Sequence, residues 1–410
     1  MNAEIVATGT ELLLGELVDT NSAYIARRLR EIGVNLYYKT TVGDNLERIA
    51  RALEIALSRA DVVITTGGLG PTVDDVTRDA VARVMQRPLV LDERQLARIE
   101  ALFARWGRPM NPNNRRQAYL PQGAIAIDNA VGTAPGFIVE GPRGTVISIP
   151  GVPREMEYMM ENAVLPYLRS RQEKPEVIVA KTLRTVGIGE SAIDEQLDDL
   201  MRLSNPTVGL AAHAGQTDIR ITAKADSEAM AQRMIAEVEA QVRARVGEYV
   251  YGEGQETVEE VTARLLASRG WRVAIAEGSA TGLVARRLAA TPDGEKVVAM
   301  ALKVGEGAAG LDALGVDLAG RSGARFTADD AEAWAVALRQ RAGADIGLVV
   351  LGTISPEGGL YGKGTAETHI ALAMPDGVEH RTYPMGSTDE LTQRWISNRA
   401  LDWLRRIALT

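Results

Sequence analysis

A short apolar run that leads directly into a glycine-rich turn most restricts how this chain of 410 residues can fold. Residues 62–66 read VVITT, and a β-branched segment of this length is typical of a buried parallel strand. Gly67, Gly68 and Gly70 follow it at once, and apolar side chains then recur at helical spacing over residues 76–84. The pattern predicts a strand, a tight turn and a helix in immediate succession.

Two aspartates accompany the glycines in this turn. A glycine turn before a helix lets backbone amides approach an anion, which the helix dipole also favours. Asp74 and Asp75 would repel a phosphate unless a divalent cation bridged carboxylate and phosphate oxygens. The alternative is a tight turn in which an aspartate only caps the helix. We favour a ligand site because the glycines, Thr72 and both carboxylates are packed together.

Two earlier segments repeat the order of strand, polar turn and helix. Residues 3–8 and 35–42 are predicted strands, and this alternation is typical of a parallel sheet with helices on both faces. Thr10 and Glu11 follow the first strand and Asp44 follows the second, at the strand ends where open α/β sheets bind ligands. Glu11 and Asp44 are equally well interpreted as solvated loop carboxylates.

Four segments within the first 170 residues together resemble the CinA family of competence- and damage-inducible proteins. They read GTELLLG from Gly9, TTGGLGPTVDDVTRDA from Thr65, GTAPG from Gly132 with Asn129 before it, and PGVPREM from Pro150. The resemblance implies a MoaB/MogA-like, molybdopterin-binding-fold domain with three layers over residues 1–168. It also implies a homodimer, and hydrolysis of ADP-ribose to AMP and ribose 5-phosphate by this domain.

The resemblance and the turn chemistry together give the expected site. Asp74, Asp75 and Asp44 would hold a divalent metal ion that polarises the diphosphate and lowers the pKa of a bound water. The catalytic candidates are Asp74, Asp75 and Glu11, and the order of residues does not decide which aspartate is ligand and which is base. The expected substrate-binding residues are Thr10, Gly67, Gly68, Gly70, Thr72, Asn129, Gly132, Gly151 and Pro153. We expect the four turns near Gly9, Gly67, Gly132 and Gly151 to surround one pocket.

A polar stretch, residues 111–117, contains Arg115 and Arg116. Either arginine is suited to bidentate contact with a phosphate. A surface loop explains the composition equally well, and both interpretations stay open from the sequence.

Residues 177–249 predict a small α+β unit, between linkers at 169–176 and 251–255, that resembles the KH-like module of CinA proteins. We interpret it as a spacer and dimer contact. Its segment GIGES, residues 187–191, has the form of a weak phosphate-binding turn. Acidic Glu190, Asp194 and Glu195 favour a helix start without a ligand.

Residues 257–410 resemble the α/β C-terminal domain of CinA proteins, a nicotinamide-mononucleotide deamidase whose motif is AESCTGG. The nucleophilic serine position of that motif is Gly278 here, and Ser279 occupies the cysteine position. The positions of the family's tyrosine and lysine are Gly305 and Gly310, with Lys303 nearby but out of register. An activated serine needs an adjacent base, so we expect a degenerate, inactive site. Ser279 acting with Lys303 in an altered geometry is the second interpretation.

Composition limits the class of protein. The chain has no cysteine, and its three histidines lack metal-ligand spacing, so a bound metal is expected on oxygen ligands. The net charge of −8 offers no basic excess for general nucleic-acid binding. With no signal-peptide pattern and no apolar run near the roughly 20 residues of a membrane span, we expect a cytoplasmic protein without a membrane partner.

Two other functions compete with ADP-ribose hydrolysis. The pocket of the first domain is also suited to holding a pterin or nucleotide without turning it over, since a fold does not settle activity. Alternatively, the C-terminal domain is an active nicotinamide-nucleotide amidohydrolase. Trp395 and Trp403, on a predicted closing helix at 391–407, are interpreted as core residues rather than a nucleotide-stacking platform.

Overall fold

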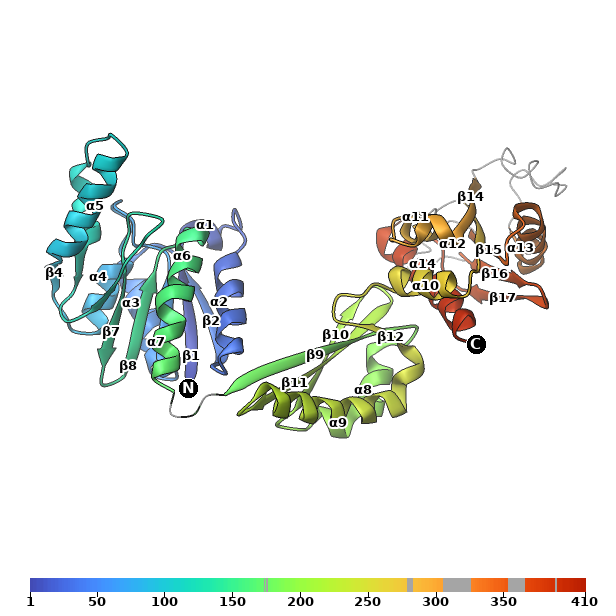
Figure 1. Ribbon diagram of the computed structural model, residues 1–410, viewed down its shortest axis with the longest axis horizontal. Coiled ribbons are helices and arrows are strands. Elements are labelled where there is room, and N and C mark those ends of the chain that lie inside the picture. The colour runs from blue at the N-terminus through green and yellow to red at the C-terminus, as the bar shows by residue number, and fades with distance from the viewer. Residues whose placement is uncertain (173, 175, 279–282, 305–325, 353–365, 388) are drawn as a thin grey trace. The chain divides into compact units, whose positions relative to one another are not determined.

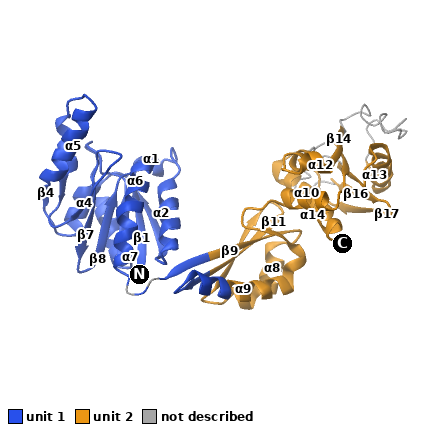
Figure 2. Ribbon diagram, in the orientation of Figure 1, with its two compact units in different colours: residues 1–179, 223–234 blue, residues 180–222, 235–410 orange. Residues whose placement is uncertain are grey.

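The computed structural model describes residues 1–172, 174, 176–278, 283–304, 326–352, 366–387 and 389–410 (Figure 1). The chain forms two compact units, coloured separately in Figure 2. They are Met1–Val179 with Ala223–Met234, and Ala180–Thr222 with Ile235–Thr410. The division falls inside the predicted middle module, whose strands and helices contribute to both units.

A six-stranded sheet forms the centre of the first unit (Figure 1). Its strands lie in the order β2 (Asn35–Val42), β1 (Asn2–Thr8), β3 (Val62–Thr66), β8 (Gly144–Ile149), β7 (Gly136–Gly141) and β6 (Ile125–Ile127). β2, β1 and β3 are parallel, as predicted, and β8 is parallel to β3. The expectation of a parallel sheet is wrong for β7 and β6, which pair antiparallel. A tight hairpin joins β7 to β8 and leaves no room for a crossover helix.

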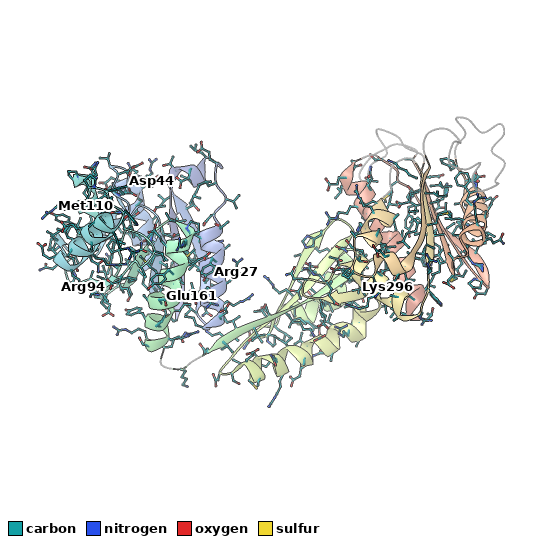
Figure 3. The ribbon with its side chains drawn as sticks, turned by 45° about the horizontal axis from the view of Figure 1, so that its top comes forward. Arg27, Asp44, Arg94, Met110, Glu161 and Lys296 are labelled. Atoms are coloured by element: carbon teal, nitrogen blue, oxygen red, sulfur yellow. The ribbon has the colours of Figure 1, made fainter. Side chains whose placement is uncertain are left out.

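Helices cover both faces of this sheet, so the predicted three layers are confirmed. One face carries α2 (Thr20–Glu31), α6 (Pro153–Met159), η2 (Met160–Val164) and α7 (Leu165–Ser170), and the other carries α3 (Leu46–Leu57) and α4 (Thr77–Val84). Ile25 and Ile64 share one core, while Leu53 and Val63 share the other, because successive strand residues point to opposite faces. Glu161 of η2, labelled in Figure 3, accepts hydrogen bonds from the α2 side.

Short elements complete the first unit. They are α1 (Thr10–Leu13), β4 (Leu89–Leu91), α5 (Glu93–Arg105), the 3-10 helix η1 (Pro112–Ala118) and β5 (Tyr119–Pro121). β4 and β5 pair as a separate two-stranded sheet. Most of the polar stretch at 111–117 belongs to η1. The side chain of Asn111 caps this helix by accepting a hydrogen bond from the amide of Asn113.

The middle module is a four-stranded sheet with two main helices. Its strands lie in the order β10 (Thr207–His213), β11 (Gln216–Ala225), β9 (Val177–Val186) and β12 (Val250–Glu253), and its helical elements are α8 (Glu190–Met201), α9 (Glu228–Val246) and η3 (Gly247–Tyr249). The prediction of a linker at 251–255 is wrong, because β12 pairs with β9 and buries Val250 and Tyr251. A strand of four residues that includes Gly252 carries too little alternation to predict.

A five-stranded sheet forms the C-terminal domain. Its strands lie in the order β14 (Val298–Val304), β13 (Val273–Gly278), β15 (Ile346–Gly352), β16 (Thr368–Met374) and β17 (Gly377–Tyr383). β13 is parallel to both β14 and β15, whereas β16 is antiparallel to β15 and to β17. β16 and β17 form an antiparallel hairpin at one edge of the sheet. The sequence did not predict β14.

Helices cover both faces of this sheet as well. One face carries α10 (Val258–Ser268), α11 (Leu283–Ala289), α12 (Gly294–Val297) and α14 (Glu390–Leu409), and the other carries α13 (Ala328–Ala342). Trp403 lies in the first of these cores and Trp395 packs at its edge, which confirms the interpretation of both as packing residues. Within the described ranges, no helix has the length and apolarity needed to cross a membrane.

A buried ion-pair network joins α14 to the middle module. Asp402 accepts from Nη2 of Arg405 at 2.7 Å and from Nε of Arg406 at 2.9 Å. Arg405 also donates to the backbone carbonyl of Glu248 at 3.0 Å. The side chains of Asp402 and Arg405 are only 7% and 3% exposed, so each charge depends on the other for compensation.

Asp402→Ala is therefore expected to lower the free energy of unfolding of the second unit by about 3–5 kcal/mol, because it leaves the guanidinium of Arg405 buried and unpaired. The measurement is a urea titration followed by tryptophan fluorescence, since four of the five tryptophans belong to this unit. Asp198→Ala is the matched control, because Asp198 pairs with Arg202 on the exposed surface of α8 and its loss should change little. Equal destabilisation by the two variants would contradict the buried network.

Candidate functional site

The register of the first sheet brings the ends of its parallel strands to one edge. Thr8 of β1 lies opposite Val42 of β2. Thr66 of β3 pairs with Ala7 of β1 on one side and with Ile149 of β8 on the other. The loop between β6 and β7 reaches the same edge, because β7 runs in the opposite direction. Several loops therefore meet where open α/β sheets bind ligands.

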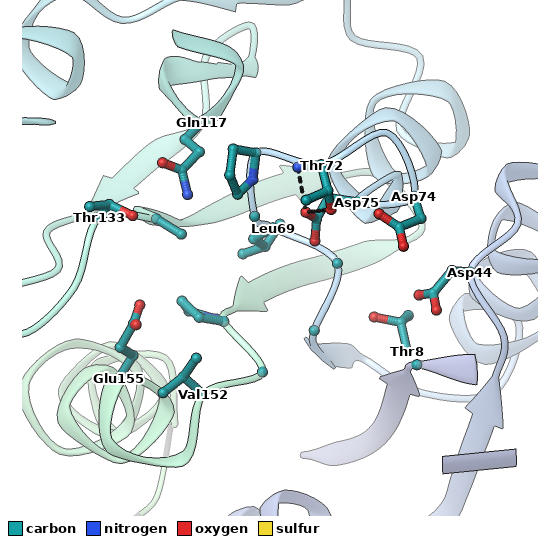
Figure 4. A pocket seen from close by; sticks show the side chains of 18 of the residues that line it. Thr8, Asp44, Leu69, Thr72, Asp74, Asp75, Gln117, Thr133, Val152 and Glu155 are labelled. Atoms are coloured by element: carbon teal, nitrogen blue, oxygen red, sulfur yellow. Dashed lines mark hydrogen bonds between the residues drawn. The ribbon is translucent and has the colours of Figure 1, made fainter. Parts of the chain in front are cut away.

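These loops surround a pocket of about 430 Å³ (Figure 4). Its lining residues are Thr8, Gly9, Glu11, Asp44, Gly67, Gly68, Leu69, Gly70, Pro71, Thr72, Asp74, Asp75, Gln117, Thr133, Ala134, Pro150, Gly151, Val152 and Glu155. Each of the four turns that the sequence placed around one pocket contributes to it, the third through Thr133 and Ala134. The volume lies within the roughly 300–1,000 Å³ of small-molecule sites.

The turn after β3 requires glycine at two positions. Gly67 and Gly68 have φ angles of +107° and +65°. A side chain at Gly67 would also place its Cβ 2.3 Å from the carbonyl oxygen of Thr8. The amides of Gly68, Leu69 and Gly70 donate to no described part of the chain. Successive amides left unpaired in a turn are suited to binding anionic oxygens.

The two aspartates of this turn lie in different environments. Thr72 donates its amide (2.8 Å) and its hydroxyl to Oδ2 of Asp75, and a dashed line marks this contact in Figure 4. Asp75 therefore fixes the shape of the turn. Asp74 is exposed, and hydrogen bonding within the turn lowers the pKa of its carboxyl. Asp74 is thus an anion at neutral pH.

The carboxylates that follow β1 and β2 join the aspartates on one wall. Figure 4 shows Asp44 on the same side of the pocket as Asp74. Thr10 donates its amide (2.8 Å) and its hydroxyl (2.9 Å) to Oδ2 of Asp44, so it positions this carboxylate and does not itself line the pocket. Glu11 lies over Gly9, where a Cβ would come within 2.4 Å of its Oε1.

Charge is the clearest property of the pocket. It is lined by five carboxylates, and its described lining contains no lysine, arginine or histidine. An anionic ligand would therefore need a cation here. Across the described ranges, no three or more acidic or histidine side chains are grouped to hold a metal, so Asp44, Asp74 and Asp75 do not by themselves form a three-ligand site. One or two of these carboxylates, completed by phosphate oxygens and water, fit the usual binding of Mg²⁺.

The opposite wall contains Glu155, which the sequence analysis did not single out (Figure 4). Its Oε2 accepts a hydrogen bond of 2.5 Å from the buried side chain of Asn129. A Cβ at Gly132 would lie 2.1 Å from Cδ of Glu155. Burial raises the pKa of Glu155, although the hydrogen bond from Asn129 acts in the opposite direction. Asn129, Gly132 and Pro153 do not line the pocket: the first two support Glu155 and Pro153 begins α6.

Two arginines donate hydrogen bonds to backbone carbonyls of the turn after β3. Arg78 of α4 is buried and donates Nη2 to the carbonyl of Leu69 at 2.8 Å. Burial lowers the pKa of Arg78 to about 10, which leaves it charged at neutral pH. Arg116 donates Nη1 to the carbonyl of Thr72 at 3.1 Å. Neither Arg115 nor Arg116 lines the pocket, so the structure does not place either at the bidentate phosphate contact that the sequence left open.

The glycine turn of the middle module packs against α14. The carbonyl of Gly187 accepts a hydrogen bond of 2.7 Å from Nη1 of Arg399 on α14. A Cβ at Gly187 would lie 3.0 Å from Oδ2 of Asp402. Gly189 then begins α8 without a side-chain cap.

The degenerate deamidase positions are only partly described. Gly278 is buried and ends β13, where it pairs with Val304 of β14. Lys303 lies opposite Glu277 in the same register and is exposed. Three further positions lie outside the described residues: Ser279, Gly305 and Gly310.

Family models match three consecutive parts of the chain. Residues 4–170 match the model described as "Probable molybdopterin binding domain". Residues 180–252 match "Damage-inducible protein CinA KH domain", and residues 255–408 match "CinA C-terminal domain".

Two individual relatives match over the full chain, and one crystal structure matches over part of it. A CinA-like protein of Dictyoglomus thermophilum is 39% identical over 409 residues, which are 99% of this chain and 99% of that protein. A CinA-like protein of Kosmotoga olearia is 38% identical over an aligned length of 412, which covers 100% of this chain and 99% of that protein. The crystal structure of CinA from Thermoplasma acidophilum, described as having unknown function, is 36% identical, with a TM-score of 0.38, over 41% of this chain and 97% of that chain. The identity to the two full-length relatives shows that the chain belongs to the CinA family.

Proposed function

We propose that the N-terminal domain hydrolyses the diphosphate of ADP-ribose in the presence of a divalent ion and releases AMP and ribose 5-phosphate. The observation that carries this proposal is the combination of unpaired turn amides with carboxylates in one pocket. The amides of Gly68, Leu69 and Gly70 are suited to a phosphate, while the described lining supplies five carboxylates and no cationic side chain. A phosphate and its metal ion satisfy both features, whereas either alone satisfies one.

The aspartate wall is the place for the ion in this proposal. Asp74 is exposed and ionised, and Asp44 lies on the same side of the pocket, so these two carboxylates would hold it, with Asp75 shaping the turn beside them. When bound, the ion supplies positive charge that neutralises the diphosphate and stabilises the charge of the transition state. Glu11 and Asp75 also line this pocket.

The turn amides would bind and orient the diphosphate. The guanidinium of Arg78 holds the carbonyl of Leu69 in place, which restrains the turn that carries these amides. Gly151 approaches Gly67 so closely that a Cβ would lie 3.2 Å from Cα of Gly67. The turns after β3 and β8 therefore pack directly against each other. Fixed donors of this kind need no reorganisation when charge develops on a phosphate oxygen.

A second candidate is a binding protein that holds a pterin or nucleotide without turnover. Residues 4–170 match a molybdopterin binding domain model, and a fold alone does not determine activity. Incubation of the purified protein with ADP-ribose and a panel of divalent ions separates the two candidates. Ion-dependent release of AMP supports the hydrolase, and tight binding without product supports the binding protein.

The C-terminal domain is proposed to lack deamidase activity. The position that carries the nucleophilic serine in the resembling family is Gly278, which has no side chain, and a Cβ there would lie 2.9 Å from Cδ2 of Leu351. Without a hydroxyl at this position, amide hydrolysis lacks its expected nucleophile.

Asp74→Asn combined with Asp75→Asn is expected to lower kcat for ADP-ribose by at least about 100-fold, because several kcal/mol of metal-dependent charge stabilisation would be lost. AMP release measured by chromatography, at increasing concentrations of Mg²⁺ or Mn²⁺, gives both the rate and the ion dependence. Asp79→Asn is the matched control on α4, since Asp79 does not line the pocket. Unchanged turnover and ion affinity in the double variant would remove the basis of the proposal.

The full chain is expected to release no ammonia from nicotinamide mononucleotide above the rate of a sample without protein, because residue 278 supplies no hydroxyl. A coupled ammonia assay measures this directly. Release that is abolished by Ser279→Ala would contradict the proposal and would establish the displaced serine as a nucleophile.

A further inference from the structure

Glu155 has no role in the function proposed above, although it lies across the pocket from the aspartates (Figure 4). It belongs to the first turn of α6, three residues after the turn that ends β8. It is half-buried, and no ion pair joins it to any described residue. A buried carboxylate without a cationic partner is unusual on structural grounds alone.

The side chain of Asn129 fixes one oxygen of this carboxylate. Its Oδ1 accepts from the amide of Val131 at 3.1 Å, and its Nδ2 donates to the carbonyl of Ala134 at 2.9 Å. These two contacts determine which way the amide points, so Nδ2 is the atom that donates to Oε2 of Glu155 at 2.5 Å. Oε2 is thereby occupied, and Oε1 remains the oxygen to exchange a proton.

The surroundings of Glu155 contain few charges. Burial and the hydrogen bond from Asn129 are the influences on its pKa, and burial dominates and raises it. Its charged neighbours on α6, Arg154 and Glu157, are both exposed. The other acidic groups of the pocket come from the turns after β1, β2 and β3. The backbone at Gly132 packs directly against the Glu155 carboxylate and excludes any side chain there.

We propose that Glu155 is the general base of the pocket and takes a proton from the water that attacks the diphosphate. This inference rests on the proposed hydrolase function. The water oxygen forms a bond to one phosphorus, and its proton passes to Oε1 of Glu155. The bond from that phosphorus to the bridging oxygen breaks, and its electron pair stays on the leaving phosphate. A phosphate monoester, whose second pKa is about 6, departs without needing a proton.

The aspartates are less suited to this task. Asp75 uses Oδ2 to accept two hydrogen bonds from Thr72. Asp74 lies on the same side of the pocket as Asp44, where the proposed ion would occupy its carboxylate. A base is most effective when its pKa lies close to the working pH, and burial moves Glu155 in that direction. In this proposal the aspartate wall holds the ion, and Glu155 on the opposite wall accepts the proton.

Glu155→Gln is the direct test, because the glutamine oxygen still accepts from Asn129 while the side chain no longer titrates. We expect kcat for AMP release to fall by about 100-fold or more. The wild-type rate should be lost as the pH falls through the raised pKa of Glu155, because a protonated carboxyl cannot accept a proton. The acid limb of the pH profile should disappear in the variant.

Two comparisons separate a base from a structural residue. Affinity for ADP-ribose, measured by titration calorimetry, should be unchanged or tighter in Glu155→Gln, because a negative charge near the diphosphate is removed. Glu157→Gln removes an exposed carboxylate two residues further along α6 and should leave the rate and the pH profile unchanged. Thermal unfolding of both variants checks that they fold like the wild type.

Three results would overturn the assignment. If Glu155→Gln keeps the wild-type rate and acid limb, another group accepts the proton. A fall of about 100-fold in kcat for Glu11→Gln, with a shifted acid limb, would then identify Glu11 as that group. A variant whose KM rises while kcat is unchanged shows a binding role. Absence of AMP release by the wild type with every ion rejects the proposed function itself and, with it, the base, so the two failures are distinguishable.

Discussion

The parallel pairing of β1, β3 and β8 is the constraint on which the site depends. It places Thr8, Thr66 and Ile149 at one edge of the sheet, so turns that are far apart in sequence meet there. The close approach of Gly67 to the Thr8 carbonyl then sets the position of the following amides. A one-residue slip in this register would turn every side chain to the opposite face and separate the turns from one another.

Opposing electrostatic demands explain how the pocket is built. Backbone amides favour an anion at its centre, while the surrounding carboxylates repel one. The carboxylates are not equivalent: exposure and hydrogen bonds keep Asp74 ionised, whereas burial favours the protonated form of Glu155. Groups of the same chemical type can therefore serve different roles because their environments differ.

The sequence predicted the class, the layers and the turns, because strand hydrophobicity, helical spacing and glycine position are local signals. It missed β4, β5, β6, β7 and β12, which are short, contain glycine or pair antiparallel within an otherwise alternating pattern. It also missed β14, a parallel strand of seven residues without glycine, to which none of these reasons applies. Glu155 stood in a quoted motif, but its importance depends on Asn129, whose contact with it spans 26 positions of sequence. Arg78 was missed because burial, which a sequence does not display, is what sets it apart.

The contact between Arg405 and the carbonyl of Glu248 links the last helix to a module that begins far earlier in the chain. Loss of α14 would therefore remove the donor for Glu248 and the partner of the Gly187 turn together. A truncation before α14 should destabilise the middle module as well as the C-terminal domain, while the N-terminal pocket keeps its own core.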